Sequence, residues 1–180
     1  MKTTLSKIRA HGPCEESWER LLQGLGKTAA DDEPLWIDQI LDVSDLDDAL
    51  WCLRAVEGCD REIRLYAVWC VRRVQHLMDG PRNIAVLDVA ERYAHGEASD
   101  AELKAACSEA REAAQSVRAW SPAHLAAGSA AWAAVQSAAW AAAAASWWAK
   151  TAVAASRLAE RTAQAEELRR ICREMREAKP

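Results

Sequence analysis

The sequence contains no phenylalanine and two tyrosines, so its aromatic side chains are nearly all tryptophan, of which there are nine. Segments in which apolar and polar residues alternate, as they do in half-buried strands, are scarce. Prolines, glycines and capping residues instead divide the chain into segments with the apolar spacing of amphipathic helices. A chain of 180 residues is long enough to bury one core. We therefore predict an all-α, single-domain bundle of about seven or eight helices.

Disulfide and metal frameworks are also missing from the sequence. The six cysteines show no tight spacing and form no C-x-x-C pair. The N-terminal segment MKTTLSKIRA lacks the apolar core of a signal peptide. Both absences favour a reduced, cytoplasmic protein. His11 and Cys14 have the spacing of half a zinc site, but no second pair accompanies them, so we predict neither a metal nor a cofactor.

No group of residues typical of an active site is found. The four histidines are scattered along the chain and match no hydrolase or metalloprotease motif. Carboxylates are abundant, but none lies in an apolar context that would raise its pKa. The net charge of −4 argues against direct nucleic-acid binding by the whole chain. We therefore predict a protein that is not an enzyme.

Residues 119–149 contain no Asp, Glu, Lys or Arg, and most of them are alanine. Their length would suffice to cross a membrane. Alanine is only weakly apolar, however, and Gly128, Gln136 and several serines dilute the segment further, so we predict no membrane span. Alanine strongly favours helix. We expect a long helix over residues 122–149 at the centre of the bundle.

Four tryptophans carry most of the bulk of this alanine-rich segment. Trp132, Trp140, Trp147 and Trp148 fall on one broad flank of a helix, because a short repeat (SAAWAAVQ, then SAAWAAAA) spaces the first two by eight residues. The favoured interpretation is that this flank is buried core. The alternative is that it forms a surface for a partner.

Local signals indicate where the first helices begin. Pro13 can occupy the first turn of one helix, and Pro34 opens the next. Ser44 followed by Asp47 resembles a capping box, with Asp in place of Glu, before a helix that Gly58 stops.

The middle of the chain has clearer boundaries. Asp60 caps a helix with an apolar stripe, and Pro81 begins another that Gly96 terminates. Ser99 and Glu102 form a capping box that opens a helix over residues 100–120. The stripe after Asp60 consists of Ile63, Ala67, Cys70, Val74 and Leu77.

The C-terminal residues form a separate segment in this interpretation. We assign 1–150 to the helical bundle. We assign 151–180 to a charged helix that either packs on the bundle or mediates self-association, because it carries many charges and few large apolar residues.

Arginines crowd the helix expected after Asp60, and phosphate binding is one interpretation of them. The favoured interpretation is ion pairing across a helical hairpin. The break before Pro81 would fold Asp88 and Glu91 back towards Arg72 and Arg73.

Acidic residues are concentrated between positions 31 and 60. This segment contains ten acidic residues and a single basic residue, Arg54. Its net charge is therefore −9, whereas the rest of the chain has a net charge of +5. Asp38, Asp42 and Asp45 recur at helical spacing, so we expect them to line one helical face. Helix capping and solvation can explain the cluster. The alternative is a docking surface for a basic protein. The candidate partner-binding residues are Asp31, Asp32, Glu33, Asp38, Asp42, Asp45 and Asp48.

Residues 46–107 contain Arg61-Glu62-Ile63-Arg64, the pair Arg72-Arg73, Arg82 and AERYAHGEAS at 90–99, and the Ala/Trp-rich segment follows them. In these elements the chain resembles a family of bacterial and phage immunity proteins. The N-terminal residues 8–28 are similar to phage-encoded members. The resemblance implies an all-helical protein that neutralises a toxin by binding it, or, for phage members, inhibits a host defence nuclease. It implies no catalytic residues.

We therefore expect a non-enzymatic inhibitor that binds a toxin or defence nuclease, itself basic, through the acidic residues 31–60. The alternative is a structural protein that self-associates, for example as a homodimer, with no inhibitory role.

Overall fold

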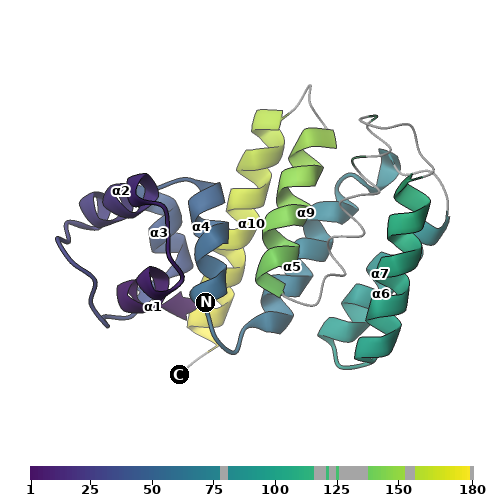
Figure 1. The fold of residues 1–180 in the computed structure, drawn as a ribbon, viewed down its shortest axis with the longest axis horizontal. Coiled ribbons are helices and arrows are strands. Elements are labelled where there is room, and N and C mark those ends of the chain that lie inside the picture. The colour runs from purple at the N-terminus through teal and green to yellow at the C-terminus, as the bar shows by residue number, and fades with distance from the viewer. Residues whose placement is uncertain (78–80, 116–120, 122–124, 126–137, 153–156, 179–180) are drawn as a thin grey trace. The chain divides into compact units, whose positions relative to one another are not determined.

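A computed structural model describes residues 1–77, 81–115, 121, 125, 138–152 and 157–178. Over these ranges the chain forms nine α-helices, two 3-10 turns and one two-stranded sheet, so the all-α class is confirmed. The chain divides into two compact units, residues 1–59 with 165–180 (unit 1) and residues 60–164 (unit 2). Figure 1 shows the fold.

The last helix of the chain is divided between the two units. The last helix, α10 (Arg157–Glu177), contributes its first part to unit 2 and its remainder to unit 1. Segments far apart in the sequence thus share a unit, because α10 makes its ion pairs with side chains from the beginning and the middle of the chain.

Unit 1 begins with a small antiparallel sheet. Strand β1 (Lys2–Thr3) pairs with β2 (Leu35–Trp36), with Lys2 opposite Trp36 and Thr3 opposite Leu35. The buried hydroxyl of Thr3 donates to the carbonyl of Ala55 at 2.6 Å. Four helices and a 3-10 turn follow: α1 (Leu5–Ala10), α2 (Glu15–Leu25), α3 (Ile37–Val43), α4 (Leu46–Cys52) and η1 (Leu53–Ala55).

The core of unit 1 consists mainly of aliphatic side chains. Its fully buried residues include Leu5, Ile8, Ile37, Ile40 and Leu50. α2 and α3 approach so closely at Gly24 that a Cβ added there would lie 2.6 Å from the Cβ of Val43. Glycine at this position is therefore required for packing.

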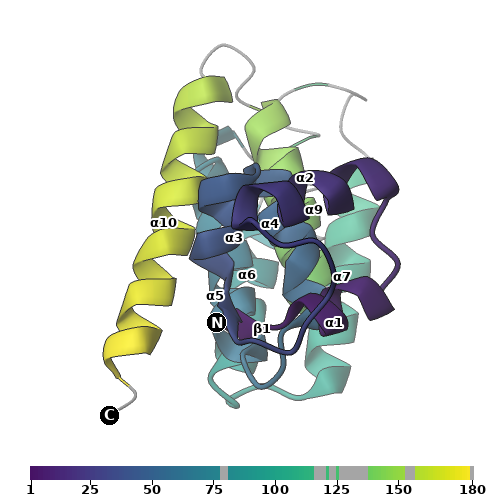
Figure 2. The same ribbon diagram turned by 90° about the vertical axis from the view of Figure 1, so that its left-hand side faces the viewer.

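The C-terminal part of α10 is held to α3 by two ion pairs. Arg169 binds Asp42 at 2.9 Å, and Arg176 binds Asp38 at 2.8 Å. The Arg176 guanidinium also lies 4.4 Å from the centre of the Trp36 ring. Figure 2 shows α3 beside this part of α10.

Two expected helix starts in unit 1 are displaced. Pro34 precedes β2 instead of opening a helix, because residues 35 and 36 pair with β1. The N-cap of α4 is Asp45, whose carboxylate accepts from the backbone N–H of Asp48 at 2.9 Å. The expected pair of Ser44 and Asp47 is therefore wrong by one residue, and the hydroxyl of Ser44 instead donates to the carbonyl of Ile40.

Unit 2 is built around α5 (Asp60–Arg72), which packs against both α6 (Pro81–Ala94) and α9 (Ala138–Ala152), as Figure 1 shows. The buried residues Ile63, Ala67, Cys70 and Val74 confirm most of the predicted apolar stripe. The capping box of Ser99 and Glu102 is also confirmed, at 2.8 Å and 3.3 Å for its two backbone bonds. The elements are α5 (Asp60–Arg72), η2 (Gln75–Leu77), α6 (Pro81–Ala94), α7 (Asp100–Gln115), α9 (Ala138–Ala152) and the first part of α10.

The arginines of α5 divide between two partners. Arg72 binds Asp88 at 2.7 Å and Glu91 at 2.9 Å, which confirms the predicted ion pairing across the hairpin. Arg73 instead binds Glu160 of α10 at 2.8 Å. The prediction for Arg73 is wrong because the tertiary fold brings a distant carboxylate closer to it.

The buried face of α9 is its alanine face. Ala138, Ala141 and Ala142 are fully buried, whereas Trp140 is 53% and Trp147 is 44% exposed. The expectation that the tryptophan flank fills the core is wrong for these two residues. Alanine lets α9 approach α5 closely, and α5 supplies large side chains such as Tyr66. Trp132 and residues 126–137 lie outside the described part of the chain.

A buried polar network joins α9 to the first part of α10. The hydroxyl of Ser146 donates to the Gln164 side chain at 2.7 Å, and the Gln164 amide donates to Glu160 at 3.1 Å. The Tyr66 hydroxyl donates to the backbone carbonyl of Gln164 at 3.3 Å. Burial raises the pKa of Tyr66 well above its ordinary value. These groups satisfy one another and fix the register of α10 on α9.

The sequence of residues 119–149 predicts no membrane span. Within the ranges that the structure describes, no helix combines the length and the apolar character that crossing a membrane requires.

Candidate functional site

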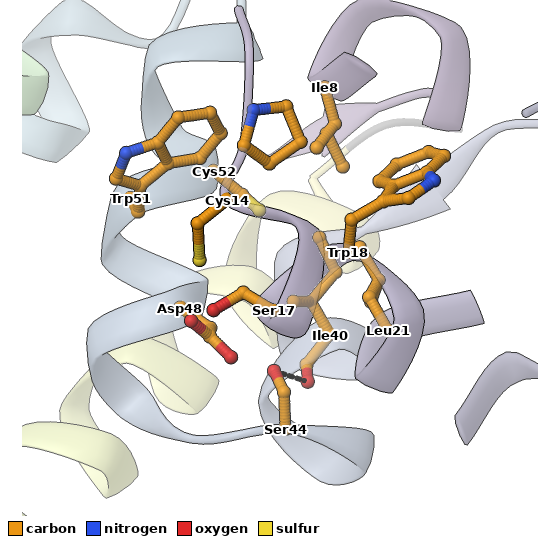
Figure 3. A pocket seen from close by; sticks show the side chains of 11 residues that line it. Ile8, Cys14, Ser17, Trp18, Leu21, Ile40, Ser44, Asp48, Trp51 and Cys52 are labelled. Carbon is orange, nitrogen blue, oxygen red and sulfur yellow. Dashed lines mark hydrogen bonds between the residues drawn. The ribbon is translucent and has the colours of Figure 1, made fainter. Parts of the chain in front are cut away.

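An open pocket of about 110 Å³ lies within unit 1 (Figure 3). Most of its wall is apolar and comes from Ile8, Trp18, Leu21, Ile40 and Trp51. The other lining residues are Pro13, Cys14, Ser17, Ser44, Asp48 and Cys52.

The pocket follows from the spacing of residues on four short helices. On α2, Leu21 follows Trp18 by three residues and Ser17 by four, so the three residues lie on one face. On α4, Asp48, Trp51 and Cys52 repeat the same spacing. α1 contributes Ile8 and α3 contributes Ile40, and Figure 3 shows Trp51 and Trp18 on opposite sides of the view.

An arginine lies over each tryptophan ring of the pocket. The guanidinium of Arg9 is 5.2 Å from the centre of the Trp18 ring, and that of Arg54 is 4.5 Å from the centre of the Trp51 ring. Arg9 also binds Glu15 at 3.3 Å. These contacts hold both indoles in place.

Carboxylates outnumber cations at the Asp48 side of the pocket. One nitrogen of Arg20 lies 3.4 Å from both Asp45 and Asp48, and another lies 3.6 Å from Glu16. A single guanidinium thus faces three carboxylates. The group keeps a local charge of −2 beside an apolar pocket.

Two cysteines with opposite properties line the pocket. The pKa of Cys14 is lowered from its ordinary value, chiefly by the side-chain hydroxyl of Ser17 and then by its backbone N–H. Burial raises the pKa of Cys52 to about 12. Cys14 is the exposed cysteine and therefore the more nucleophilic of the two.

The predicted acidic residues do not form one surface strip. Asp31 and Glu33 both bind Lys27, at 2.8 Å and 2.5 Å, while Asp32 is exposed. The Lys27 ammonium holds the pKa of Asp31 below its ordinary value. These residues form a loop cluster in which two carboxylates share one cation.

The remaining predicted residues have structural tasks. Asp38 and Asp42 hold α10, as described above, and Asp45 caps α4. The expectation that these three line one helical face is wrong, because α3 ends at Val43 and Asp45 begins the next helix.

Sequence reasoning missed the pocket itself. Trp18 and Leu21 lie on α2 and Trp51 lies on α4, and nothing in the sequence places those two helices opposite each other. The available signal was the short spacing between Pro13, Gly24 and Pro34, which predicts short helices and hence a junction among several of them.

His11 and Cys14 have the spacing of half a zinc site. Among the described residues, no three His, Cys, Asp or Glu side chains are placed to hold a metal ion. The six cysteines all lie in these ranges and form no disulfide.

A comparison with protein-family models finds no match to this chain. Comparisons with curated proteins and with solved structures find none either.

Proposed function

We propose that this protein is a non-enzymatic inhibitor that neutralises a basic toxin or defence nuclease by stoichiometric binding. The observation that supports it is the unequal sharing of cations in unit 1. Arg20 serves three carboxylates and Lys27 serves two, so ion pairing leaves negative charge on the surface. Unit 1 contains sixteen acidic and eleven basic residues.

A negative surface of this kind accelerates association with a basic protein. Long-range attraction raises the rate of productive encounter, and salt weakens it because the Debye length is about 8 Å at physiological ionic strength. Carboxylates can also occupy the positions that phosphates take in the groove of a nuclease. Binding alone would then block the active site.

The acidic residues divide into two groups in this proposal. Asp38 and Asp42 form ion pairs with arginines of α10, so their charge is neutralised within the chain. The docking surface consists instead of the loop cluster Asp31–Glu33 and the Arg20 cluster with Asp45 and Asp48. We expect the protein to act in the reducing cytoplasm, where its unbridged cysteines are stable.

Affinity capture from bacterial lysates tests the proposal. The tag belongs at the C-terminus, because Met1 is buried. A captured toxin or nuclease is then purified, its activity is titrated with this protein, and its affinity is measured at low and moderate salt. Support requires inhibition that is complete at one fixed stoichiometry and affinity that falls with salt.

A charge-reversed variant gives the sharper test. Asp32→Lys with Glu33→Lys changes the loop cluster, whereas Glu166→Lys with Glu177→Lys makes the same charge change on exposed positions of α10. We expect at least tenfold weaker partner binding for the first variant and less than twofold for the second. If both variants bind the partner equally weakly, the effect comes from net charge and not from the loop. If neither variant binds more weakly than the wild type, docking through the acidic loop is contradicted.

Self-association is the second candidate function, and exposed apolar side chains favour it. Trp140, Trp147 and Leu158 are the large apolar residues most exposed in the described ranges. Trp147 and Trp148 form an edge-to-face contact with ring centres 5.2 Å apart. Sedimentation velocity from 1 to 100 micromolar tests this candidate with Trp147→Gln as the variant. A wild-type monomer at every concentration contradicts it.

A further inference from the structure

We propose that the pocket of unit 1 receives one leucine-sized apolar side chain from the basic partner, with an arginine or lysine of the same segment beside Asp48. This inference rests on the proposed function and identifies the chemistry of the partner. It follows from the volume of the pocket, the nature of its walls and the charge along one edge.

The volume sets the size of the side chain. The pocket measures about 110 Å³. A closed apolar cavity of about 150 Å³ accommodates benzene. A branched aliphatic side chain, which is smaller than benzene, therefore fits this pocket. Because the walls are mostly apolar, water inside has few hydrogen-bonding partners and is displaced favourably.

The walls are already in place for such a side chain. Trp18 and Trp51 are each covered by an arginine, so their rings are held before the partner arrives. The residues that dominate the binding energy of protein interfaces cluster in well-packed pockets from which water is excluded, and tryptophan is enriched among them. The pocket thus provides an anchor point within a wider electrostatic surface.

The charge at the edge determines which neighbouring residue is favoured. Among the described residues that line the pocket, Asp48 is the one with a charged side chain. Arg20, which it shares with Asp45 and Glu16, lies 3.4 Å away. A second cation placed there meets three carboxylates and one guanidinium. Arg9 lies over Trp18 and Arg54 lies over Trp51, so a second cation is disfavoured beside either ring.

Three capped tripeptides separate the two contributions. Acetyl-Arg-Leu-Arg-amide contains both features, acetyl-Arg-Gly-Arg-amide lacks the apolar side chain, and acetyl-Glu-Leu-Glu-amide reverses the charge. Binding is followed through the indole N–H signals of Trp18 and Trp51 in proton–nitrogen correlation spectra. We expect the first peptide to shift both signals and to bind at least tenfold more tightly than either control.

Two variants with matched controls localise the binding. Ser17→Leu fills the pocket, and its control Gln23→Leu makes the same kind of change at an exposed position of α2. Asp48→Asn removes the edge charge, and its control Asp47→Asn lies next to it but does not line the pocket. We expect at least a tenfold loss of Arg-Leu-Arg binding for Ser17→Leu, about a threefold loss for Asp48→Asn, and no loss for the controls. Circular dichroism establishes that each variant is folded.

The outcomes distinguish this inference from the proposed function. Equal binding of the Leu and Gly peptides, or wild-type binding by Ser17→Leu, overturns the pocket assignment. A captured partner that Ser17→Leu still binds fully leaves the inhibitor function standing and removes the anchor. If the peptides bind as expected but no captured protein is inhibited, the result supports the pocket chemistry and contradicts the inhibitor function.

Discussion

One guanidinium nitrogen of Arg176 lies 2.8 and 2.9 Å from the two carboxylate oxygens of Asp38, although the two residues are 138 positions apart in the sequence. The Asp38 side chain is 14% exposed, so the contact is only partly screened by water. The acidic helix α3 therefore uses part of its charge to attach the end of the chain.

We expect Arg176→Ala to loosen the C-terminal part of α10 and to lower the free energy of unfolding by about 1 kcal/mol, as for a partly exposed ion pair. Arg176→Lys should recover only part of the loss, because lysine lacks the planar group that lies over Trp36. Urea unfolding and hydrogen exchange over residues 165–177 measure both effects. Unchanged exchange in Arg176→Ala would contradict a holding role for this contact.

Gly24→Ala should destabilise the protein, although alanine is the better helix former by about 1 kcal/mol. The added Cβ would lie 2.6 Å from the Cβ of Val43, and overpacking of this kind costs about 1–3 kcal/mol. The double variant Gly24→Ala with Val43→Ala should recover stability relative to the sum of the two single changes. Additive effects in this cycle, measured by thermal unfolding, would argue against the close approach of α2 and α3.

Gln164→Leu should cost about 2–3 kcal/mol of stability, because it leaves Glu160 and Ser146 buried with fewer partners. Gln164→Leu combined with Ser146→Ala should cost less than the sum of the single changes, since both ends of one hydrogen bond are then removed. Chemical denaturation measures the cycle. A loss below 0.5 kcal/mol for Gln164→Leu, roughly the scale of a surface substitution, would mean that the network does not stabilise unit 2.

Cys14 should react with iodoacetamide before the other five cysteines, which are buried. Its pKa is lowered by Ser17, so the thiolate forms at lower pH than in an ordinary thiol and alkylation is faster at pH 7. Ser17→Ala should move the midpoint of the rate–pH profile upwards, whereas Ser44→Ala, which changes the same pocket wall, should not. Peptide mass spectrometry identifies the modified residue. Earlier labelling of Cys52 would conflict with its burial and its raised pKa.

Local sequence signals were sufficient for several elements of the fold. Ser99 and Glu102 form their capping box because both residues lie within one helical turn. The pairing of Arg72 with Asp88 and Glu91 was predictable because a hairpin brings neighbouring helices together. The prediction that Pro34 opens a helix is wrong, because the two residues after it pair with β1, and local sequence does not show this pairing.

The candidate site was predictable only in its charge. The surplus of carboxylates between residues 31 and 60 is a property of composition. Composition does not show which of these carboxylates form ion pairs within the chain, because Arg169 and Arg176 bind Asp42 and Asp38 from the other end of the sequence. The same applies to the pocket, whose tryptophans come from two helices that only packing brings together.

By itself, the sequence determined that this protein is helical, where many of its helices begin and end, and that its acidic charge is concentrated near the N-terminus. These features depend on interactions within a few residues. Only the tertiary structure decided that α9 buries alanine and exposes Trp140 and Trp147, that Arg73 binds Glu160, and that α2 and α4 enclose a pocket. Those outcomes depend on which surfaces meet, and close packing of distant segments selects among faces that the sequence alone leaves equivalent.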